Sequence, residues 1–194
     1  MSAATPSESQ SVDLAQEARR HSEALSGKTV AILGYGNQGR AQALNLRDSG
    51  VRVIAGCRTD GHARAMAIAD RIDVLELHEA CHASDLVGIA LPDEVHETVW
   101  KSSIEKALRP GTTVGFLHGF SVRFGHVRPA ASHGVVMVAP KGPGHTLRLR
   151  YTEGLGLPAL VAVHQHGPDA AETRARMLAW AAGIGSARSE EHTS

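Results

Sequence analysis

The sequence predicts an α/β fold: a doubly wound, mostly parallel sheet of the Rossmann type with helices on both faces. Three observations predict this fold. Short apolar runs, typical of buried strands, alternate with helical patterns of about 10–15 residues. A G-x-G-x-x-G run lies directly between the first such strand and the first helix. The chain has 194 residues, which is enough for one domain with its own hydrophobic core.

The N-terminal extension, residues 1–27, precedes the regular pattern. Residues 1–10 are rich in Ser, Thr and Pro and are expected to be disordered. A short amphipathic helix is expected over 12–25. It would end there because Ser26-Gly27 breaks the pattern.

The main domain is expected to span 28–187 and to open with a strand at 29–33. That segment, TVAIL, is a continuous apolar run, as a strand buried on both faces should be. The helix over 38–48 follows the glycine run and ends at Ser49-Gly50. A second strand at 51–55 and helices over 62–70 and 75–84 complete this half.

The second half of the domain repeats the alternation. A strand at 85–91 ends at Pro92, and Pro110-Gly111 ends the helix over 94–108. The last helix is expected to end at Gly183 as its cap, and it would carry Ala170, Met177, Leu178 and Ala181 on one face. Further strands are expected at 113–117, 135–139 and 159–163, and the last helix at 169–182.

Composition excludes several classes of protein. The 20 basic and 20 acidic residues balance, and aromatic residues make up 4% of the chain, so neither nucleic acid nor an anionic membrane is expected as a partner. No apolar run approaches 18 residues, and the N-terminus has no secretory signal pattern. The two cysteines, Cys57 and Cys81, suit a reducing compartment, so a cytoplasmic location is expected.

The glycine run, Gly34 to Gly39, predicts a dinucleotide-binding loop. Gly34 would make the tight turn, Gly36 would let the backbone approach a pyrophosphate, and Gly39 would let the helix pack closely on the strand. The N–H groups at the start of the helix would bind the anion.

The end of the second strand bears on the choice of cofactor. NAD-binding sites usually place an acid there for the ribose 2′-hydroxyl, whereas NADP-binding sites place an arginine for the 2′-phosphate. Arg58 favours NADP, and Asp60 could instead reach a ribose hydroxyl. NADP(H) is therefore the expected cofactor, with NADH left open.

Four stretches together resemble one family, the ketol-acid reductoisomerases (acetohydroxyacid isomeroreductases) of branched-chain amino-acid synthesis. The resemblance covers roughly residues 28–188 and corresponds to the family's N-terminal nucleotide-binding domain. The stretches are GYGNQGRAQALNLRDSG at 34–50, LPDEVH at 91–96, HGFSVRFG at 118–125 and APKGPGHTLRLRYTEGLGLPALVAV at 139–163.

The resemblance implies a set of site residues. His118 matches the family's active-site histidine and Lys141 an active-site lysine. Such a histidine can shuttle a hydroxyl proton, and such a lysine can hold developing oxyanion charge. The positions implied to bind NADP are Gly34, Tyr35, Gly36, Asn37, Gln38, Gly39, Arg58, Asp93, Glu94, Val95, His96 and Gly144.

The reaction implied by the resemblance has two steps. A Mg²⁺-assisted alkyl migration rearranges 2-acetolactate or 2-aceto-2-hydroxybutyrate, and NADPH then reduces the new ketone to a 2,3-dihydroxy acid. In the family, an Asp/Glu pair in the chain after this domain and two glutamates of an all-helical domain hold the magnesium ions, and that helical domain also carries the subunit contacts. None of these segments is expected in this sequence. We therefore expect no metal ligands here, little turnover from the chain alone, and a homo-oligomeric parent enzyme.

The sequence departs from the family pattern at several positions. Gly61 and Ala63 stand where two serines usually hold the 2′-phosphate, which leaves NADH use open. His96 stands where glutamine is usual, and Arg40 where histidine is usual. The last seven residues, RSEEHTS at 188–194, match the translation of a common sequencing adapter and are expected to be foreign to the protein.

Three other interpretations remain. The first is a stand-alone nucleotide-binding module without catalysis, and the second is a fragment of another NAD(P)-dependent hydroxyacid dehydrogenase. The third is a zinc peptidase, because His78, Glu79 and His82 match H-E-x-x-H. A surface helix with two histidines explains that pattern better, since no third ligand follows at the usual spacing.

Overall fold

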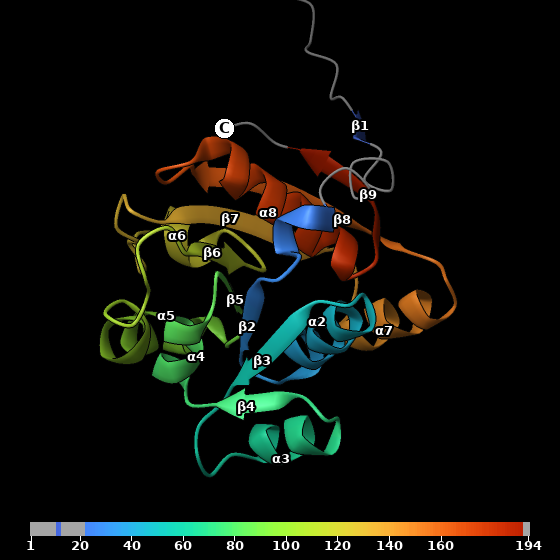
Figure 1. Ribbon diagram of the computed structural model, residues 1–194, viewed down its shortest axis with the longest axis horizontal. Helices are drawn as coiled ribbons and strands as arrows, with labels where there is room; N and C mark the ends of the chain where they lie inside the picture. Colours follow the sequence, from blue (N-terminus) through green and yellow to red (C-terminus); the bar gives the residue numbers. More distant parts are fainter. Residues whose placement is uncertain (1–10, 13–21, 192–194) are drawn as a thin grey trace, which may run out of the picture.

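The computed structural model describes residues 11–12 and 22–191 and forms one α/β domain (Figure 1). The strands are β1 (Ser11–Val12), β2 (Thr29–Leu33), β3 (Arg52–Gly56), β4 (Asp73–Leu75), β5 (Leu86–Ile89), β6 (Thr113–Phe116), β7 (Gly134–Pro140), β8 (Leu157–Gln165) and β9 (Ser186–Glu191). The helices are α2 (Asn37–Asp48), α3 (His62–Ala69), α4 (Leu77–Ala83), α5 (Asp93–Val99), α6 (Phe120–Arg123), α7 (Gly144–Thr152) and α8 (Ala170–Gly183), with a 3₁₀ turn η1 (Ser22–Leu25) and a π-helical turn η2 (Trp100–Ile104).

The strands form a single nine-stranded sheet in the order β1-β9-β8-β7-β6-β5-β2-β3-β4. The six strands from β4 to β7 are mutually parallel, whereas β8 joins β7 antiparallel. The order of the parallel strands reverses between β2 and β5. Such a switch point opens a crevice at the carboxyl ends of the strands, where ligands bind in open α/β sheets.

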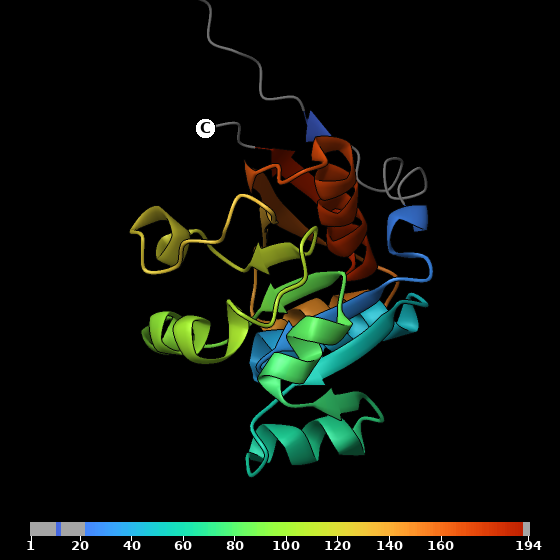
Figure 2. The ribbon, with the colours of Figure 1, turned by 60° about the vertical axis from the view of Figure 1, so that its left-hand side comes forward.

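Each face of the sheet carries its own hydrophobic core, because successive side chains of a strand point to opposite faces. In β2, Val30 and Ile32 pack with α2, α7 and α8, while Ala31 and Leu33 pack with α4 and η2. All five residues of β2 are buried. Figures 1 and 2 show the two layers of helices on either side of the sheet.

Trp180 of α8 fixes the height of that helix above the sheet. A Cβ on Gly115 would lie 2.1 Å from the indole ring, and one on Gly88 would lie 3.1 Å from it. The indole N–H donates to Oε1 of Gln42 in α2 at 3.1 Å. The two strand glycines, Gly88 and Gly115, thus leave the space that the indole ring of Trp180 fills.

The predicted fold class is confirmed, with differences in individual elements. Strands and helices occur at every predicted position from 29 onward, within a few residues. The predicted helix over 75–84 begins only at Leu77, because Leu75 pairs with Gly56 in β4. Helices α6 and α7 were not predicted. The predicted helix over 12–25 falls mostly outside the described residues, and its last four positions form η1.

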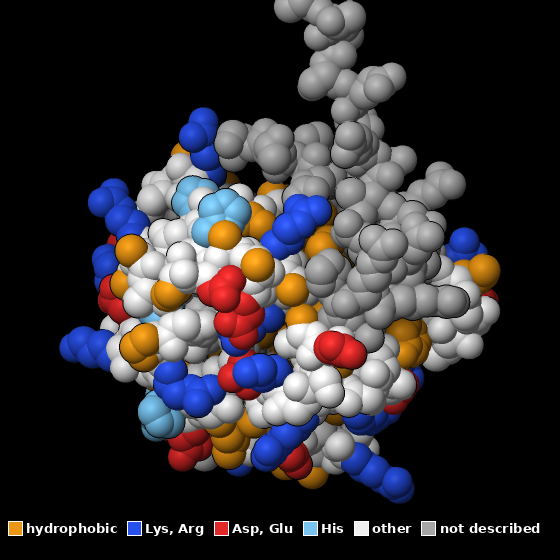
Figure 3. Space-filling view, turned by 45° about the horizontal axis from the view of Figure 1, so that its top comes forward, with side chains coloured by type: hydrophobic (Ala, Val, Ile, Leu, Met, Phe, Trp, Pro, Cys, Tyr) orange, Lys and Arg blue, Asp and Glu red, His pale blue; other side chains and the backbone are white. Residues whose placement is uncertain are grey.

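The surface carries mixed charge. Figure 3 shows acidic and basic side chains interspersed on one face, with hydrophobic side chains scattered among them. This face therefore carries no broad field of one sign. Within the described part of the chain, no helix has the length and hydropathy needed to cross a membrane.

Candidate functional site

A cavity of about 790 Å³ opens at the switch point between β2 and β5. Its wall follows the carboxyl ends of five adjacent strands, from β3 to β7, a span of roughly 19 Å at the usual strand spacing. This volume lies within the range of small-molecule and cofactor sites. The lining residues are Gly34, Tyr35, Gly36, Asn37, Gln38, Gly56, Cys57, Arg58, Ala63, Leu77, Ile89, Ala90, Leu91, Pro92, Val95, His96, Val99, Leu117, His118 and Pro140.

In the glycine loop, Gly34, Gly36 and Gly39 each lie in a different structural setting. Gly34 has φ +93°, a left-handed conformation that favours glycine. A Cβ on Gly39 would lie 2.0 Å from the carbonyl oxygen of Gly34, so Gly39 allows α2 to start tightly against the loop. A Cβ on Gly36 would meet no protein atom within 4 Å. The loop is therefore closed on its protein side and open where a ligand would approach.

Helix α7 packs behind the glycine loop, on the side away from the cavity lining. The side-chain amide of Gln38 donates to the carbonyl oxygen of Gly142 at 2.8 Å. Gly144, the first residue of α7, packs against the backbone of Asn37. Oε1 of Gln38 is buried without a hydrogen-bond partner among the described residues. A buried acceptor at the cavity wall is suited to a donor group on a bound ligand.

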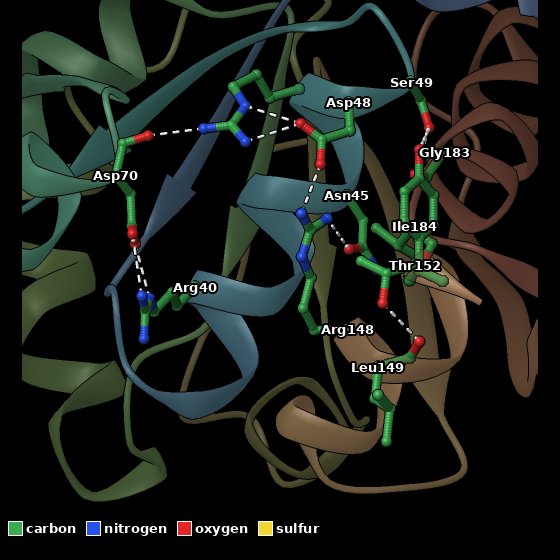
Figure 4. A network of polar contacts seen from close by, with 12 residues as sticks. Arg40, Asn45, Asp48, Ser49, Asp70, Arg148, Leu149, Thr152, Gly183 and Ile184 are labelled. Carbon is green, nitrogen blue, oxygen red and sulfur yellow. Dashed lines mark hydrogen bonds and ion pairs between the residues drawn. The ribbon is translucent and has the colours of Figure 1, made fainter. Parts of the chain in front are cut away.

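The outer face of α2 is anchored by the polar network shown in Figure 4. Arg40 forms two hydrogen bonds with Asp70, at 2.7 and 3.0 Å, which tie the first turn of α2 to the end of α3. Arg148 of α7 donates to Asn45 at 2.8 Å and to Asp48 at 2.6 Å. The helix that carries the glycine loop is thus held by α3 and α7 together.

Tyr35 supports the loop rather than facing the cavity with its hydroxyl. The residue is 1% exposed, and its hydroxyl donates to Asp70 at 3.0 Å. Burial and the neighbouring Asp70 carboxylate raise the pKa of the Tyr35 phenol above its ordinary value. The Tyr35 side chain therefore stays protonated and bonded to Asp70, and it offers no polar group to a ligand.

The β3 end of the cavity carries a positive charge beside two carboxylates. Arg58 is exposed and lines the cavity. The hydroxyl of Thr59 donates to Glu76 at 2.6 Å, which ties the loop after β3 to the start of α4. Asp60 is exposed on the same loop. Cys57 is buried in the cavity wall, and this burial raises the pKa of its thiol and so disfavours the reactive thiolate.

The opposite end of the cavity carries His118. Its half-exposed imidazole places Nε2 3.3 Å from Oδ1 of Asp93, the first residue of α5. His96, one turn along α5, is 5% exposed. Its Nδ1 lies 2.7 Å from the hydroxyl of Ser121, and its Nε2 lies 2.9 Å from the carbonyl oxygen of Leu91. A titratable ring beside an acid, at a cavity mouth, is suited to proton transfer.

Most of the predicted site residues meet at this cavity. Nine of the fourteen line it: Gly34, Tyr35, Gly36, Asn37, Gln38, Arg58, Val95, His96 and His118. Gly39 and Gly144 shape it by packing, and Asp93 touches it through His118. Glu94 and Lys141 are exposed and are not lining residues; the backbone N–H of Lys141 donates to Pro158 at 2.8 Å.

Sequence reasoning missed the apolar part of the wall. Cys57, Leu77, Val99, Leu117 and Pro140 line the cavity. Cys57, Leu117 and Pro140 lie at or just after the ends of predicted strands, and Leu77 begins a helix. Their position at the ends of elements is the sequence signal that would have found them. Only the pairing of strands shows which of these ends adjoin.

No metal centre is formed by the described residues, since nowhere do three or more His, Cys, Asp or Glu side chains gather suitably. The H-E-x-x-H pattern lies on α4, with His78 and His82 exposed. Glu79 accepts the backbone N–H of Glu76 at 3.1 Å as part of a capping box. Helix capping therefore accounts for Glu79.

Comparison with known proteins gives a consistent result. Residues 24–190 match the family model described as acetohydroxy acid isomeroreductase, NADPH-binding domain. A ketol-acid reductoisomerase (NADP(+)) from Pyrobaculum arsenaticum is 49% identical over 166 residues, which cover 86% of this chain and 50% of that protein. The chain thus spans about half the length of this curated relative.

Solved structures agree. An NADH-preferring ketol-acid reductoisomerase from an uncultured archaeon superposes with a TM-score of 0.84 and 37% identity, covering 89% of this chain and 54% of that one. A semialdehyde dehydrogenase NAD-binding protein from Cupriavidus necator has a TM-score of 0.69 and 22% identity, covering 86% of this chain and 63% of that one. The second likeness reflects the fold alone.

Proposed function

The chain belongs to the acetohydroxy acid isomeroreductase (ketol-acid reductoisomerase) family, whose NADPH-binding domain it matches, and from this premise we propose that its cavity binds NADP(H). The observation that supports the proposal most directly is Gly36: its α-carbon faces space that no protein atom fills, at the start of a twelve-residue helix. A pyrophosphate fits that space because the first N–H groups of a helix are unpaired donors.

The residues present suit a dinucleotide. The glycine loop would hold the pyrophosphate, and Gln38 would accept a hydrogen bond through its unpaired Oε1. Arg58 would bind the 2′-phosphate at one end of the cavity, and His118 lies at the other end, where the reacting groups would meet. When bound, NADPH supplies the hydride for reduction of a ketone.

For the whole protein we propose the reaction of the family. The substrates are 2-acetolactate or 2-aceto-2-hydroxybutyrate, and the products are 2,3-dihydroxy acids on the route to valine, leucine and isoleucine. His118 would exchange a proton with the substrate hydroxyl, and Lys141, directly after cavity residue Pro140, would approach the developing oxyanion. The same proposal includes a homo-oligomeric enzyme in the cytoplasm; the two free cysteines suit that compartment.

The described residues do not fit the Mg²⁺ that the alkyl migration requires. Magnesium is bound through carboxylates in near-octahedral geometry, and no suitable group of ligands occurs among residues 23–186. We therefore propose that the 194-residue chain binds nucleotide but does not turn over by itself.

The cofactor preference is the finer part of the proposal. Arg58 favours NADP(H), and the relative from Pyrobaculum arsenaticum is named as NADP(+)-dependent. Asp60 and Glu76 lie at the same end of the cavity, and the archaeal structure is of an NADH-preferring enzyme. We propose NADPH as the preferred cofactor, because Arg58 is among the residues that line the cavity and Asp60 and Glu76 are not.

A thermal melt of the chain with NADPH, and separately with NADH, tests the proposal. A ligand at one hundred times its dissociation constant adds roughly 2.7 kcal/mol, which raises the melting temperature by several degrees. The expected result is a larger shift with NADPH than with NADH. A larger shift with NADH would reverse the preference, and a cooperative melt with no shift for either would contradict nucleotide binding.

A further inference from the structure

An unsatisfied carboxylate oxygen faces the imidazole of His118. Oδ1 of Asp93 is buried and has no hydrogen-bond partner among the residues that the structure describes. Two ring nitrogens lie near it: Nε2 of His118 at 3.3 Å and Nδ1 of His96 at 3.5 Å. A buried carboxylate oxygen without a donor is costly. These two imidazoles are the donors that the structure places within 3.5 Å of this oxygen among the described residues.

His96 is already committed to other partners. Its Nε2 lies 2.9 Å from the carbonyl oxygen of Leu91, which can only accept, so Nε2 carries the proton. In the neutral ring, Nδ1 then accepts the hydroxyl hydrogen of Ser121 at 2.7 Å. This leaves His118 as the donor to Asp93.

His96 also links the two segments that carry Asp93 and His118. Through Leu91 it holds the turn that leads into Asp93, and through Ser121 it holds the start of α6, three residues after His118. Both partners of the proposed contact are therefore fixed by one buried side chain, at the position where the family resemblance leads one to expect glutamine.

We propose that Asp93 is the positioning residue of His118: its carboxylate accepts the Nε2–H and holds the neutral imidazole in the Nε2–H tautomer, with Nδ1 unprotonated. The two atoms lie 3.3 Å apart and the ring is half-exposed; catalytic hydrogen bonds are often long or poorly aligned in unliganded sites and tighten when the ligand binds. A carboxylate that orients a histidine in this way is a recurrent device in enzymes.

For the reaction, this tautomer leaves Nδ1 of His118 as the atom that would accept a proton from the substrate hydroxyl. Nδ1 of His118 has no partner among the described residues, and His118 lines the cavity. Nδ1 would therefore take the proton from the substrate hydroxyl, whose oxygen keeps the electron pair. The imidazolium that forms would have its charge balanced by Asp93. This step rests on the proposed function, whereas the tautomer itself does not.

The test is nuclear magnetic resonance of the chain with isotopically labelled histidine. The chain contains 12 histidines, so the His118→Gln variant identifies the His118 signals by their loss. A hydrogen bond to a charged group favours one tautomer by roughly tenfold or more. We expect that preference for Nε2–H in the wild type and its loss in the Asp93→Asn and Asp93→Ala variants.

Glu97→Gln is the matched control, because it removes a different carboxylate from α5 and should leave His118 unchanged. A wild-type His118 with no more preference than free histidine overturns the proposal without any variant. The proposal is also overturned if a folded Asp93 variant shows the same His118 tautomer ratio as the wild type. The spectra are recorded without nucleotide, so a failed cofactor melt would contradict the proposed function and leave this result standing.

Discussion

The carbonyl oxygen of Asn37 occupies the place where a side chain on Gly144 would begin. A Cβ at Gly144 would lie 2.0 Å from that oxygen and 2.5 Å from the Asn37 carbonyl carbon. Helix α7 therefore packs directly on the backbone of the glycine loop. The hydrogen bond from Gln38 to Gly142 closes the same contact at 2.8 Å. The absence of a side chain at Gly144 therefore allows the close approach of α7 to the glycine-loop backbone.

Gly144→Ala is expected to destabilise the chain by about 1–3 kcal/mol, because the added methyl group overlaps backbone atoms that cannot rotate away. Urea unfolding measures the change. Gly61→Ala is the control: its Cβ would lie 3.8 Å from the nearest atom, an ordinary contact, and its cost should stay below about 1 kcal/mol. Equal effects of the two substitutions would contradict the proposed packing.

Gly36→Ala should separate binding from stability. A Cβ there meets no protein atom within 4 Å, so the free energy of unfolding should change by less than about 1 kcal/mol. The same methyl group would occupy the space proposed for the pyrophosphate, so NADPH affinity should fall by about tenfold or more. Isothermal titration measures it, and unchanged affinity would place the pyrophosphate elsewhere.

Arg58→Gln should weaken NADPH binding by about tenfold and leave NADH binding within about twofold, since only NADPH carries the 2′-phosphate. Titration with each nucleotide measures the ratio. Arg52→Gln is the matched control, because Arg52 is an exposed arginine at the amino end of the same strand. If both nucleotides lose affinity equally, Arg58 does not discriminate between them.

Asp70→Asn tests the anchor of α2. Hydrogen bonds from Arg40 hold the pKa of the Asp70 carboxyl below its ordinary value, with a further contribution from Tyr35. The unfolded state therefore binds the proton more tightly, so this contribution is present above about pH 4 and is lost as the pH falls through the folded pKa.

For this variant we expect a loss of about 1–3 kcal/mol at pH 7 and a shallower fall in stability below pH 4 than in the wild type. Urea unfolding at pH 7 and pH 3 gives both quantities. Asp60→Asn, on an exposed loop, should follow the wild-type curve. A variant curve parallel to that of the wild type across this range would remove Asp70 from the acid response.

The parts of the site that could be predicted were local in sequence. Gly34, Gly36 and Gly39 follow a strand and open a helix, so their spacing carries their geometry. Arg58 follows the next strand, whose carboxyl end must adjoin the first in a parallel sheet. For His118 the family resemblance supplied the signal, and the structure adds its position at the same cavity.

The rest depended on contacts between distant segments. Strand β4 has three residues, too few for an alternation pattern to show. Helix α7 mixes arginines and leucines without a clear apolar face, and its place is set by Gly144 against Asn37. The contact between Asp93 and His118 joins the start of α5 to the loop after β6. No spacing within either segment announces it.

The bond between Gln38 and Gly142 joins residues 104 positions apart, and this separation affects the order in which a ribosome completes the site. The glycine motif emerges early in synthesis, together with the strand that carries it. The helix that packs behind it, α7, emerges only after residue 144, once five further parallel strands, β3 to β7, have been made. A nascent chain halted before that point would carry the whole motif without the helix that packs against its backbone.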